Sequence, residues 1–152
     1  MEEDISNIDD IGIDLPDIPM PDENAQTQEI EDEFEGAYKF AIIGVGQGGS
    51  RIAETFWNLG YRRVCVINTA KQDLKYINIP EDRKLLLDHG GAGKDPETAE
   101  RIFQENSEEI CDFFRAKLGT TYDRVLVCAG AGGGTGAGGA PVVFKIAQEN
   151  TD

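Results

Sequence analysis

Glycine dominates the stretch 130–139, where seven of ten residues are glycine. The apolar run 125–129 before it is typical of a strand buried on both faces. After it, Pro141 is typical of the first turn of a helix that continues through residues 142–147. Glycines leave backbone N–H groups uncovered, and a helix N-terminus attracts negative charge. The stretch therefore predicts an anion-binding loop; the alternative interpretation is a flexible glycine linker.

A second glycine-rich stretch follows an apolar strand pattern at residues 38–44. Its glycines at 44, 46 and 49 match the GxGxxG spacing of a dinucleotide-binding loop, and a helical pattern runs from it to Gly60. An NAD(P) site also requires an acid at the end of the next strand, to hold the ribose hydroxyls. That strand, residues 63–67, is followed instead by Asn68 and Thr69. An NAD(P)-binding Rossmann module is therefore the weaker alternative.

The remaining patterns predict a short helical turn at 71–74, a third strand at 84–88 and a fourth at 122–128. Asp95 and Pro96 form an N-cap and N1 pair that opens one long helix ending near Gly119. Alternating strands and helices indicate a doubly wound, mainly parallel, Rossmann-like α/β sheet. If the strand order is 3-2-1-4, the fourth strand lies at an edge. The loops 44–51, 68–73, 89–95 and 130–139 would share the carboxyl edge, where ligands bind.

The charge of the chain is divided unevenly along its length. Residues 1–38 contain no Lys or Arg and 14 of the 29 acidic residues, which leaves 15 acids against 14 bases in residues 39–152. Prolines and isolated isoleucines interrupt any regular period in residues 1–36, so we expect a disordered acidic tail there. Residues 11–20 of this tail are a candidate docking motif for an adaptor. Residues 37–152 are long enough for one hydrophobic core.

The composition argues against several other functions. Residues 39–152 have no excess of positive charge for a nucleic-acid groove, and no apolar run approaches the length of a membrane span. Cys65 and Cys128 lie within apolar strand patterns, where we expect reduced core cysteines. His89 is the single histidine of the sequence and has no neighbours for metal or triad chemistry. The acidic N-terminus is unlike a targeting signal, so we expect a cytoplasmic protein.

The glycine stretches resemble the nucleotide loops of a known family. The sequence GAGGGTGAG, which begins at Gly130, resembles the GGGTG(S/T)G loop of the tubulin/FtsZ superfamily. Residues 46–57 are similar to the first loop and helix of eukaryotic tubulins. Residues 68–74 and 91–96 resemble the Asn-Thr-Asp-Ala-Gln and Gly-Ala-Gly-Gly-Asn-Pro loops of FtsZ. The resemblance covers residues 38–150 and leans toward archaeal or phage tubulin-like proteins rather than bacterial FtsZ.

This resemblance implies the nucleotide-binding part of a cytoskeletal protein that binds GTP and Mg²⁺. Such a protein assembles head to tail with copies of itself into filaments, hydrolyses GTP at subunit interfaces, and serves cell division, cell shape or the positioning of DNA or phage. The loop around Gln47 would contact phosphates and magnesium, the loop 92–95 would sense the γ-phosphate, and Gly130 would lie near the ribose. No catalytic residue and no direct metal ligand is assigned. The expected nucleotide-binding residues are Gly46, Gln47, Gly48, Gly49, Ser50, Asn68, Thr69, Ala92, Gly93, Lys94, Asp95, Gly130, Gly133, Gly134, Thr135 and Gly136.

Three departures from the family pattern limit what is carried over. Ala70 stands where FtsZ has an aspartate near the metal, so that role does not transfer to this position. Lys94 places a cation in the γ-phosphate loop; the alternative is a surface lysine balanced by Asp95 and Glu97. The family's guanine-reading asparagine, central helix and acidic catalytic loop have no counterpart in residues 1–152, so we expect this chain alone not to hydrolyse GTP. A non-catalytic protein that binds partners through its acidic tail is a further alternative.

Overall fold

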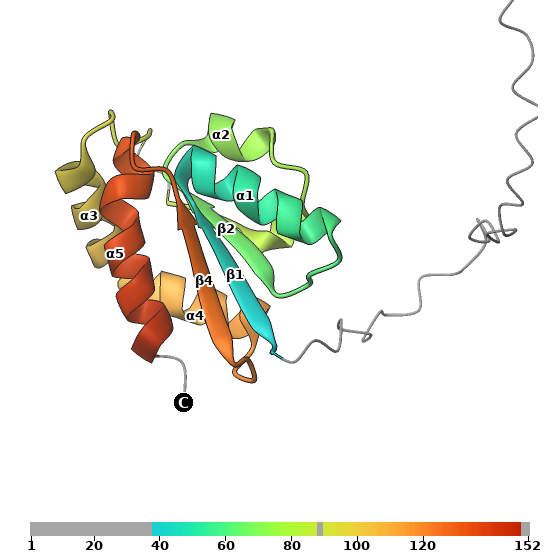
Figure 1. The fold of residues 1–152 in the computed structure, drawn as a ribbon. Helices are drawn as coiled ribbons and strands as arrows, with labels where there is room; N and C mark the ends of the chain where they lie inside the picture. Colours follow the sequence, from blue (N-terminus) through green and yellow to red (C-terminus); the bar gives the residue numbers. More distant parts are fainter. Residues whose placement is uncertain (1–37, 88–89, 150–152) are drawn as a thin grey trace, which may run out of the picture. The chain divides into compact units, whose positions relative to one another are not determined.

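A computed structural model describes residues 38–87 and 90–149 of the chain. Within them, parallel strands form one four-stranded sheet in the order β3-β2-β1-β4 (Figure 1). The predicted doubly wound α/β sheet is therefore confirmed, with β4 at an edge. The predicted acidic tail, its docking motif and His89 lie outside the described residues. The strands are β1 (Phe40–Val45), β2 (Val64–Asn68), β3 (Lys84–Leu86) and β4 (Arg124–Ala129).

Helices cover both faces of the sheet. Successive side chains of a strand point to opposite faces, and here both sets are apolar and need to be buried. Ile43 and Cys65 pack in a cluster with Phe103 and Phe114 from the helices α3 and α4. On the opposite face, Ile42, Val64 and Val66 pack in a second cluster with residues of α1 and α2. The helices are α1 (Gly46–Asn58), α2 (Lys71–Lys75), α3 (Pro96–Glu105), α4 (Ser107–Leu118) and α5 (Gly134–Glu149), with a 3₁₀ turn at Glu81–Arg83.

The two cysteines predicted to be core residues are buried and free. Burial raises the pKa of the Cys65 thiol, with a small opposing effect of Arg83, and burial also raises the pKa of the Cys128 thiol. Both thiols therefore stay protonated at neutral pH and act as small apolar side chains.

The single long helix predicted after Pro96 is wrong, because the chain forms two helices that meet at Asn106. Asn106 has φ −107° and ψ 20°, outside regular helix values, and its side-chain amide donates to the carbonyl of Ile102 at 2.7 Å. Asparagine competes for backbone hydrogen bonds in this way, which favours helix ends over helix interiors. The predicted cap at Asp95 and the predicted end near Gly119 are confirmed.

The predicted start of the last helix at Pro141 is also wrong. α5 begins at Gly134, inside the glycine stretch, and Pro141 lies within it. A Cβ at position 139 would lie 2.6 Å from the Phe103 ring, and a Cβ at position 138 would collide with the carbonyl oxygen of Pro96. Glycine is a poor helix former, but here it lets α5 lie directly against α3, so packing outweighs propensity.

β4 is less buried than its apolar sequence predicts. Val125 and Val127 are half-buried against the cluster on the α5 side, whereas Leu126 on the other face is 37% exposed. The physical reason is position: β1 pairs with β4 on one side, and within the described residues no strand pairs with it on the other. An apolar run therefore indicated a strand correctly, but not its degree of burial.

Candidate functional site

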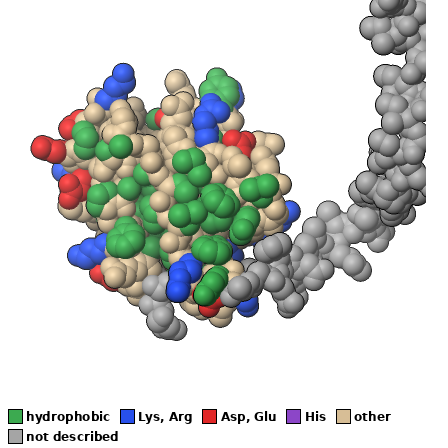
Figure 2. Space-filling view, viewed as in Figure 1, with side chains coloured by type: hydrophobic (Ala, Val, Ile, Leu, Met, Phe, Trp, Pro, Cys, Tyr) green, Lys and Arg blue, Asp and Glu red, His purple; other side chains and the backbone are tan. Residues whose placement is uncertain are grey.

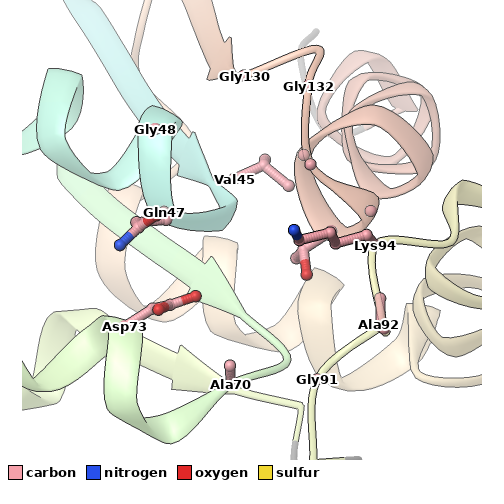
Figure 3. Close-up of a pocket in the computed structure, with 15 residues that line it drawn as sticks. Val45, Gln47, Gly48, Ala70, Asp73, Gly91, Ala92, Lys94, Gly130 and Gly132 are labelled. Carbon is pink, nitrogen blue, oxygen red and sulfur yellow. The ribbon is translucent and has the colours of Figure 1, made fainter.

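Four loops meet in a cavity of about 780 Å³ at the carboxyl ends of the strands. The carboxyl ends of parallel strands lie at one edge of the sheet, so loops that are distant in sequence come together there (Figure 3). The residues that line the cavity are Val45, Gln47, Gly48, Ala70, Asp73, Gly91, Ala92, Gly93, Lys94, Gly130, Gly132, Gly133, Gly134, Thr135 and Gly136.

The first loop is the tight turn from β1 into α1. Gly46 has φ 70°, and a Cβ there would lie 2.9 Å from the backbone nitrogen of Gly136. The buried Ser50 hydroxyl donates to the Gly46 carbonyl at 2.7 Å, which fixes the first turn of α1. Gln47 and Gly48 are thereby left exposed at the cavity. Gly46 and Ser50 shape this loop from behind, and neither lines the cavity.

The loop after β2 is held by a buried asparagine. The Asn68 side-chain oxygen accepts from the backbone N–H of Thr69 at 2.8 Å and of Ala70 at 3.2 Å. The hydroxyls of Thr69 and Thr135 lie 2.8 Å apart, which ties this loop to the N-terminus of α5. Asn68 and Thr69 are fully buried, so they position the loop beneath the cavity and do not line it.

The loop before α3 presents Lys94 to the cavity. Lys94 has φ 61°, and within the described residues it is the single non-glycine residue with positive φ. The N–H of Gly91 donates to the Thr69 carbonyl at 2.9 Å, which anchors the other end of the loop to the residue that follows β2. In Figure 3 the Lys94 side chain reaches from this loop toward the cavity wall formed by Val45 and Gln47.

Asp95 caps α3 and does not line the cavity. Its carboxylate accepts from the N–H groups of Glu97 and Thr98, both at 3.2 Å, and from the Thr98 hydroxyl. The Thr98 hydroxyl hydrogen bond lowers the pKa of Asp95, and the two backbone donors add to this effect. Because the folded-state pKa lies below the unfolded value, the cap stabilises α3 at neutral pH and is lost as pH falls through the folded-state pKa.

The loop after β4 runs directly into α5, so the helix N-terminus itself lies at the cavity. A Cβ at position 134 would lie 2.7 Å from the backbone nitrogen of Asp95, and one at position 136 would lie 2.6 Å from the carbonyl oxygen of Gly130. Gly132 and Gly133 are different, because a Cβ at either position would have no atom within 4 Å. These two glycines face open space over the cavity.

Not all of the sixteen predicted residues reach the cavity. Gln47, Gly48, Ala92, Gly93, Lys94, Gly130, Gly133, Gly134, Thr135 and Gly136 line it, whereas Gly46, Gly49, Ser50, Asn68, Thr69 and Asp95 form the layer that supports it. Five lining residues belong to the four loops predicted at the ligand-binding edge but were not among the sixteen predicted nucleotide contacts: Val45, Ala70, Asp73, Gly91 and Gly132. Asp73 is the charged one among them, and its place in the first turn of a helix at the carboxyl edge was the signal that could have identified it.

The charges of the cavity are few. Among the described residues that line it, Lys94 carries the one cation and Asp73 the one carboxylate. Figure 3 shows them on opposite sides, with the Asp73 carboxylate directed into the cavity beside Gln47. Most of the remaining lining is glycine backbone, which offers N–H groups and a close approach rather than side-chain chemistry.

Within the described residues no helix is long and apolar enough to cross a membrane.

Several known proteins are similar in sequence to most of this chain. Tubulin-like protein CetZ1 of Haloferax volcanii is 37% identical over 120 residues, which are 70% of this chain and 30% of CetZ1. Cell division protein FtsZ 2 of Halobacterium salinarum is 42% identical over 125 residues, which are 78% of this chain and 30% of that protein. The chain thus spans about 30% of the length of these curated relatives.

Solved structures with the same fold include two from Haloferax volcanii. The GDP-bound CetZ1 monomer superimposes with a TM-score of 0.68 at 33% identity, over 73% of this chain and 38% of CetZ1. The CetZ2 protofilament bound to GTPγS superimposes with a TM-score of 0.64 at 28% identity, over 75% of this chain and 37% of CetZ2. The sequence model of the Tubulin/FtsZ family, GTPase domain, matches residues 39–152, and the chain therefore belongs to this family.

Proposed function

We propose that the cavity binds GTP together with Mg²⁺. The observation that carries this proposal is the convergence of the loops around Gln47, Asp73, Lys94 and Gly133 in one space lined by glycine backbone. Backbone N–H groups and the N-terminus of α5 suit an anion of high charge, and Lys94 adds a full positive charge. A triphosphate that spans several loops fits this lining better than a single phosphate group does.

We propose further that the chain is the nucleotide-binding part of a filament-forming GTPase. Support comes from its family and from its relatives, of which CetZ1 is described with GDP and CetZ2 as a protofilament with GTPγS. In this proposal the intact protein assembles with copies of itself in the cytoplasm and hydrolyses GTP where subunits meet. Cell division, cell shape, and the positioning of DNA or phage remain the candidate processes.

The NAD(P) alternative is less well supported by the same geometry. β2 ends at Asn68, whose buried side chain is occupied by the backbone of Thr69 and Ala70. It therefore offers no carboxylate to ribose hydroxyls at this strand end. The alternative that the acidic tail binds a partner concerns residues outside the described part of the chain.

GTP binding is tested with a substitution at Gly133, because a Cβ there would have no protein atom within 4 Å. We expect Gly133→Val to weaken GTP binding roughly tenfold to a hundredfold, as for the loss of one hydrogen bond of about 1.5–3 kcal/mol to a charged group. Calorimetric titration of the chain with GTP, ATP and NAD measures the affinities, and phosphate release from the same samples is expected to stay at background.

The control for this experiment is Ala116→Val, an added branched side chain at an exposed position of α4. It is expected to bind GTP as the unchanged chain does. Gly134→Val is a less clean variant, because its side chain would displace the backbone of Lys94 and Asp95 before it met a ligand. Unchanged GTP affinity in Gly133→Val, or tighter binding of NAD than of GTP, would contradict the proposed site.

Lys94 is expected to distinguish GTP from GDP. Its left-handed backbone conformation and its exposed side chain place a cation at the cavity. Within the described residues Lys94 forms no ion pair with Asp95, whose carboxylate accepts from the N–H groups of α3. Lys94→Ala should therefore lower the affinity for GTP about tenfold more than the affinity for GDP, since a charged hydrogen bond of roughly 1.5–3 kcal/mol is lost from GTP alone.

Paired titrations with GTP and GDP measure this difference, and Lys145→Ala on the exposed surface of α5 is the matched control. Equal losses for both nucleotides in Lys94→Ala would leave Lys94 as a surface lysine without a role in reading the terminal phosphate.

A further inference from the structure

Asp73 is a carboxylate in a cavity that otherwise suits an anion. It belongs to the first turn of α2, is half-buried, and lines the cavity on the side of Gln47 (Figure 3). Its neighbour in the lining, Ala70, contributes only a methyl group. The carboxylate is therefore the single negative side chain among the described residues that line the cavity.

Hydrogen bonding holds Asp73 from one side only. The amide of the buried Asn68 donates to one carboxylate oxygen, Oδ2, at 3.3 Å. Within the described part of the chain, the other oxygen, Oδ1, has no hydrogen bond, and Asp73 forms no ion pair with Lys94 or any other residue. Asp73 is thus oriented by the protein while one of its oxygens remains available to the cavity.

A carboxylate beside nucleotide phosphates would repel them unless a cation lay between the two. Like charges repel each other more strongly near a protein surface than in bulk water, because the effective dielectric constant is lower there. A bound divalent cation reverses the sign of this interaction, because it attracts both groups. The position of Asp73 therefore favours a ligand that brings its own metal ion.

We propose that Asp73 holds the hydrated Mg²⁺ that accompanies the nucleotide. This inference rests on the proposed GTP site and assigns one wall of the cavity to the metal. The surroundings fit this ion: Mg²⁺ is commonly held by one or two carboxylates plus substrate phosphates and keeps several waters. The described residues contain no cluster of three or more His, Cys, Asp or Glu, so the protein alone offers no complete site for a metal without the nucleotide.

The test compares Asp73→Asn with the unchanged chain. Asparagine keeps the size of the side chain and an oxygen that can accept from Asn68, but it removes the charge. GTP affinity is measured by calorimetry in Mg²⁺ and again in EDTA, and Mn²⁺ is used in place of Mg²⁺ to record the electron paramagnetic resonance spectrum of the bound ion. Asp112→Asn, at an exposed position of α4, is the matched control.

The unchanged chain and Asp112→Asn are expected to bind GTP more tightly in Mg²⁺ than in EDTA. In Asp73→Asn the affinity of the metal in the presence of GTP should fall roughly tenfold to a hundredfold, as for the loss of a partner of a bound metal. Its affinity for GTP in EDTA should be unchanged or higher, because a repulsive charge has been removed. The Mn²⁺ spectrum should change in Asp73→Asn and stay the same in Asp112→Asn.

Three outcomes would overturn the inference. The first is a full magnesium effect in Asp73→Asn. The second is an equal loss of GTP affinity in Mg²⁺ and EDTA, which would make Asp73 a support for Asn68 and its loop. The third is GTP binding by the unchanged chain that is independent of Mg²⁺. Failure of the unchanged chain to bind GTP under either condition would instead overturn the proposed function.

Discussion

Alanine at position 49 is expected to lower the melting temperature of the chain sharply, although the substitution adds a single methyl group. A Cβ at this position would collide with the carbonyl oxygen of Cys128 and lie 2.8 Å from its carbonyl carbon. Both atoms belong to the backbone of β4, which is held by its pairing with β1 and cannot withdraw. Overpacking of a core costs roughly 1–3 kcal/mol, and backbone collisions fall at or beyond the upper end of this range.

Thermal unfolding followed by circular dichroism measures this effect. Gly133→Ala is the matched control, because the same methyl group there has no atom within 4 Å and no positive φ to strain it. It should leave the melting temperature of the chain almost unchanged. Equal melting temperatures for Gly49→Ala and the unchanged chain would show that α1 moves away from β4 at little cost.

The two glycines differ in a way that their sequence context does not reveal. Both lie in glycine-rich loops at the carboxyl edge of the sheet, and both were predicted to contact a nucleotide. Gly133 lines the cavity, whereas Gly49 is buried between α1 and β4. Spacing identifies a loop in which the backbone must come close to something. Only the fold decides whether that neighbour is a ligand or another part of the chain.

The sequence was most informative where local chemistry determines the structure. Asp95 followed by Pro96 predicted the start of α3, because the carboxylate bonds to backbone N–H groups within the same turn. The parallel sheet and the four loops at its carboxyl edge followed from the alternation of elements and the handedness of their connections, whereas the order 3-2-1-4 was assumed and agrees with the structure. The first inference depends on residues next to each other in sequence, and the second depends on general rules of topology. Neither requires knowledge of contacts between distant side chains.

The sequence was least informative where packing outweighs local preference. Residues 134–140 contain four glycines and read as a loop, yet they are helical because close contact with α3 compensates for their low propensity. Asp73 lies in the predicted ligand loop 68–73, but it was not assigned to the binding site, for a related reason. Its place at the cavity depends on how the fold brings α2 close to Gln47 and Lys94. These three residues belong to segments that are distant from one another in sequence.

The surface beside the edge strand β4 is apolar and grooved. Beside β4 lies a groove of about 440 Å³ lined by Val127, Ala129, Gly130, Ala131, Gly136, Ala137, Ala140, Pro141 and Phe144, and we call it the edge groove. Phe144 is 58% exposed, and Figure 2 shows hydrophobic side chains gathered on this face of the molecule. Unpaired strand edges next to apolar surface promote association between chains.

The chain is therefore expected to self-associate through β4 and the edge groove. Sedimentation velocity over a range of concentrations measures the association. Phe144→Lys should reduce it strongly, because a charge in the lining of the groove must lose its hydration on association. Leu59→Lys is the matched control, since Leu59 is 70% exposed at the C-terminal end of α1 and does not line the groove. A chain that remains monomeric at all concentrations, or an equal effect of both substitutions, would show that this edge does not mediate association.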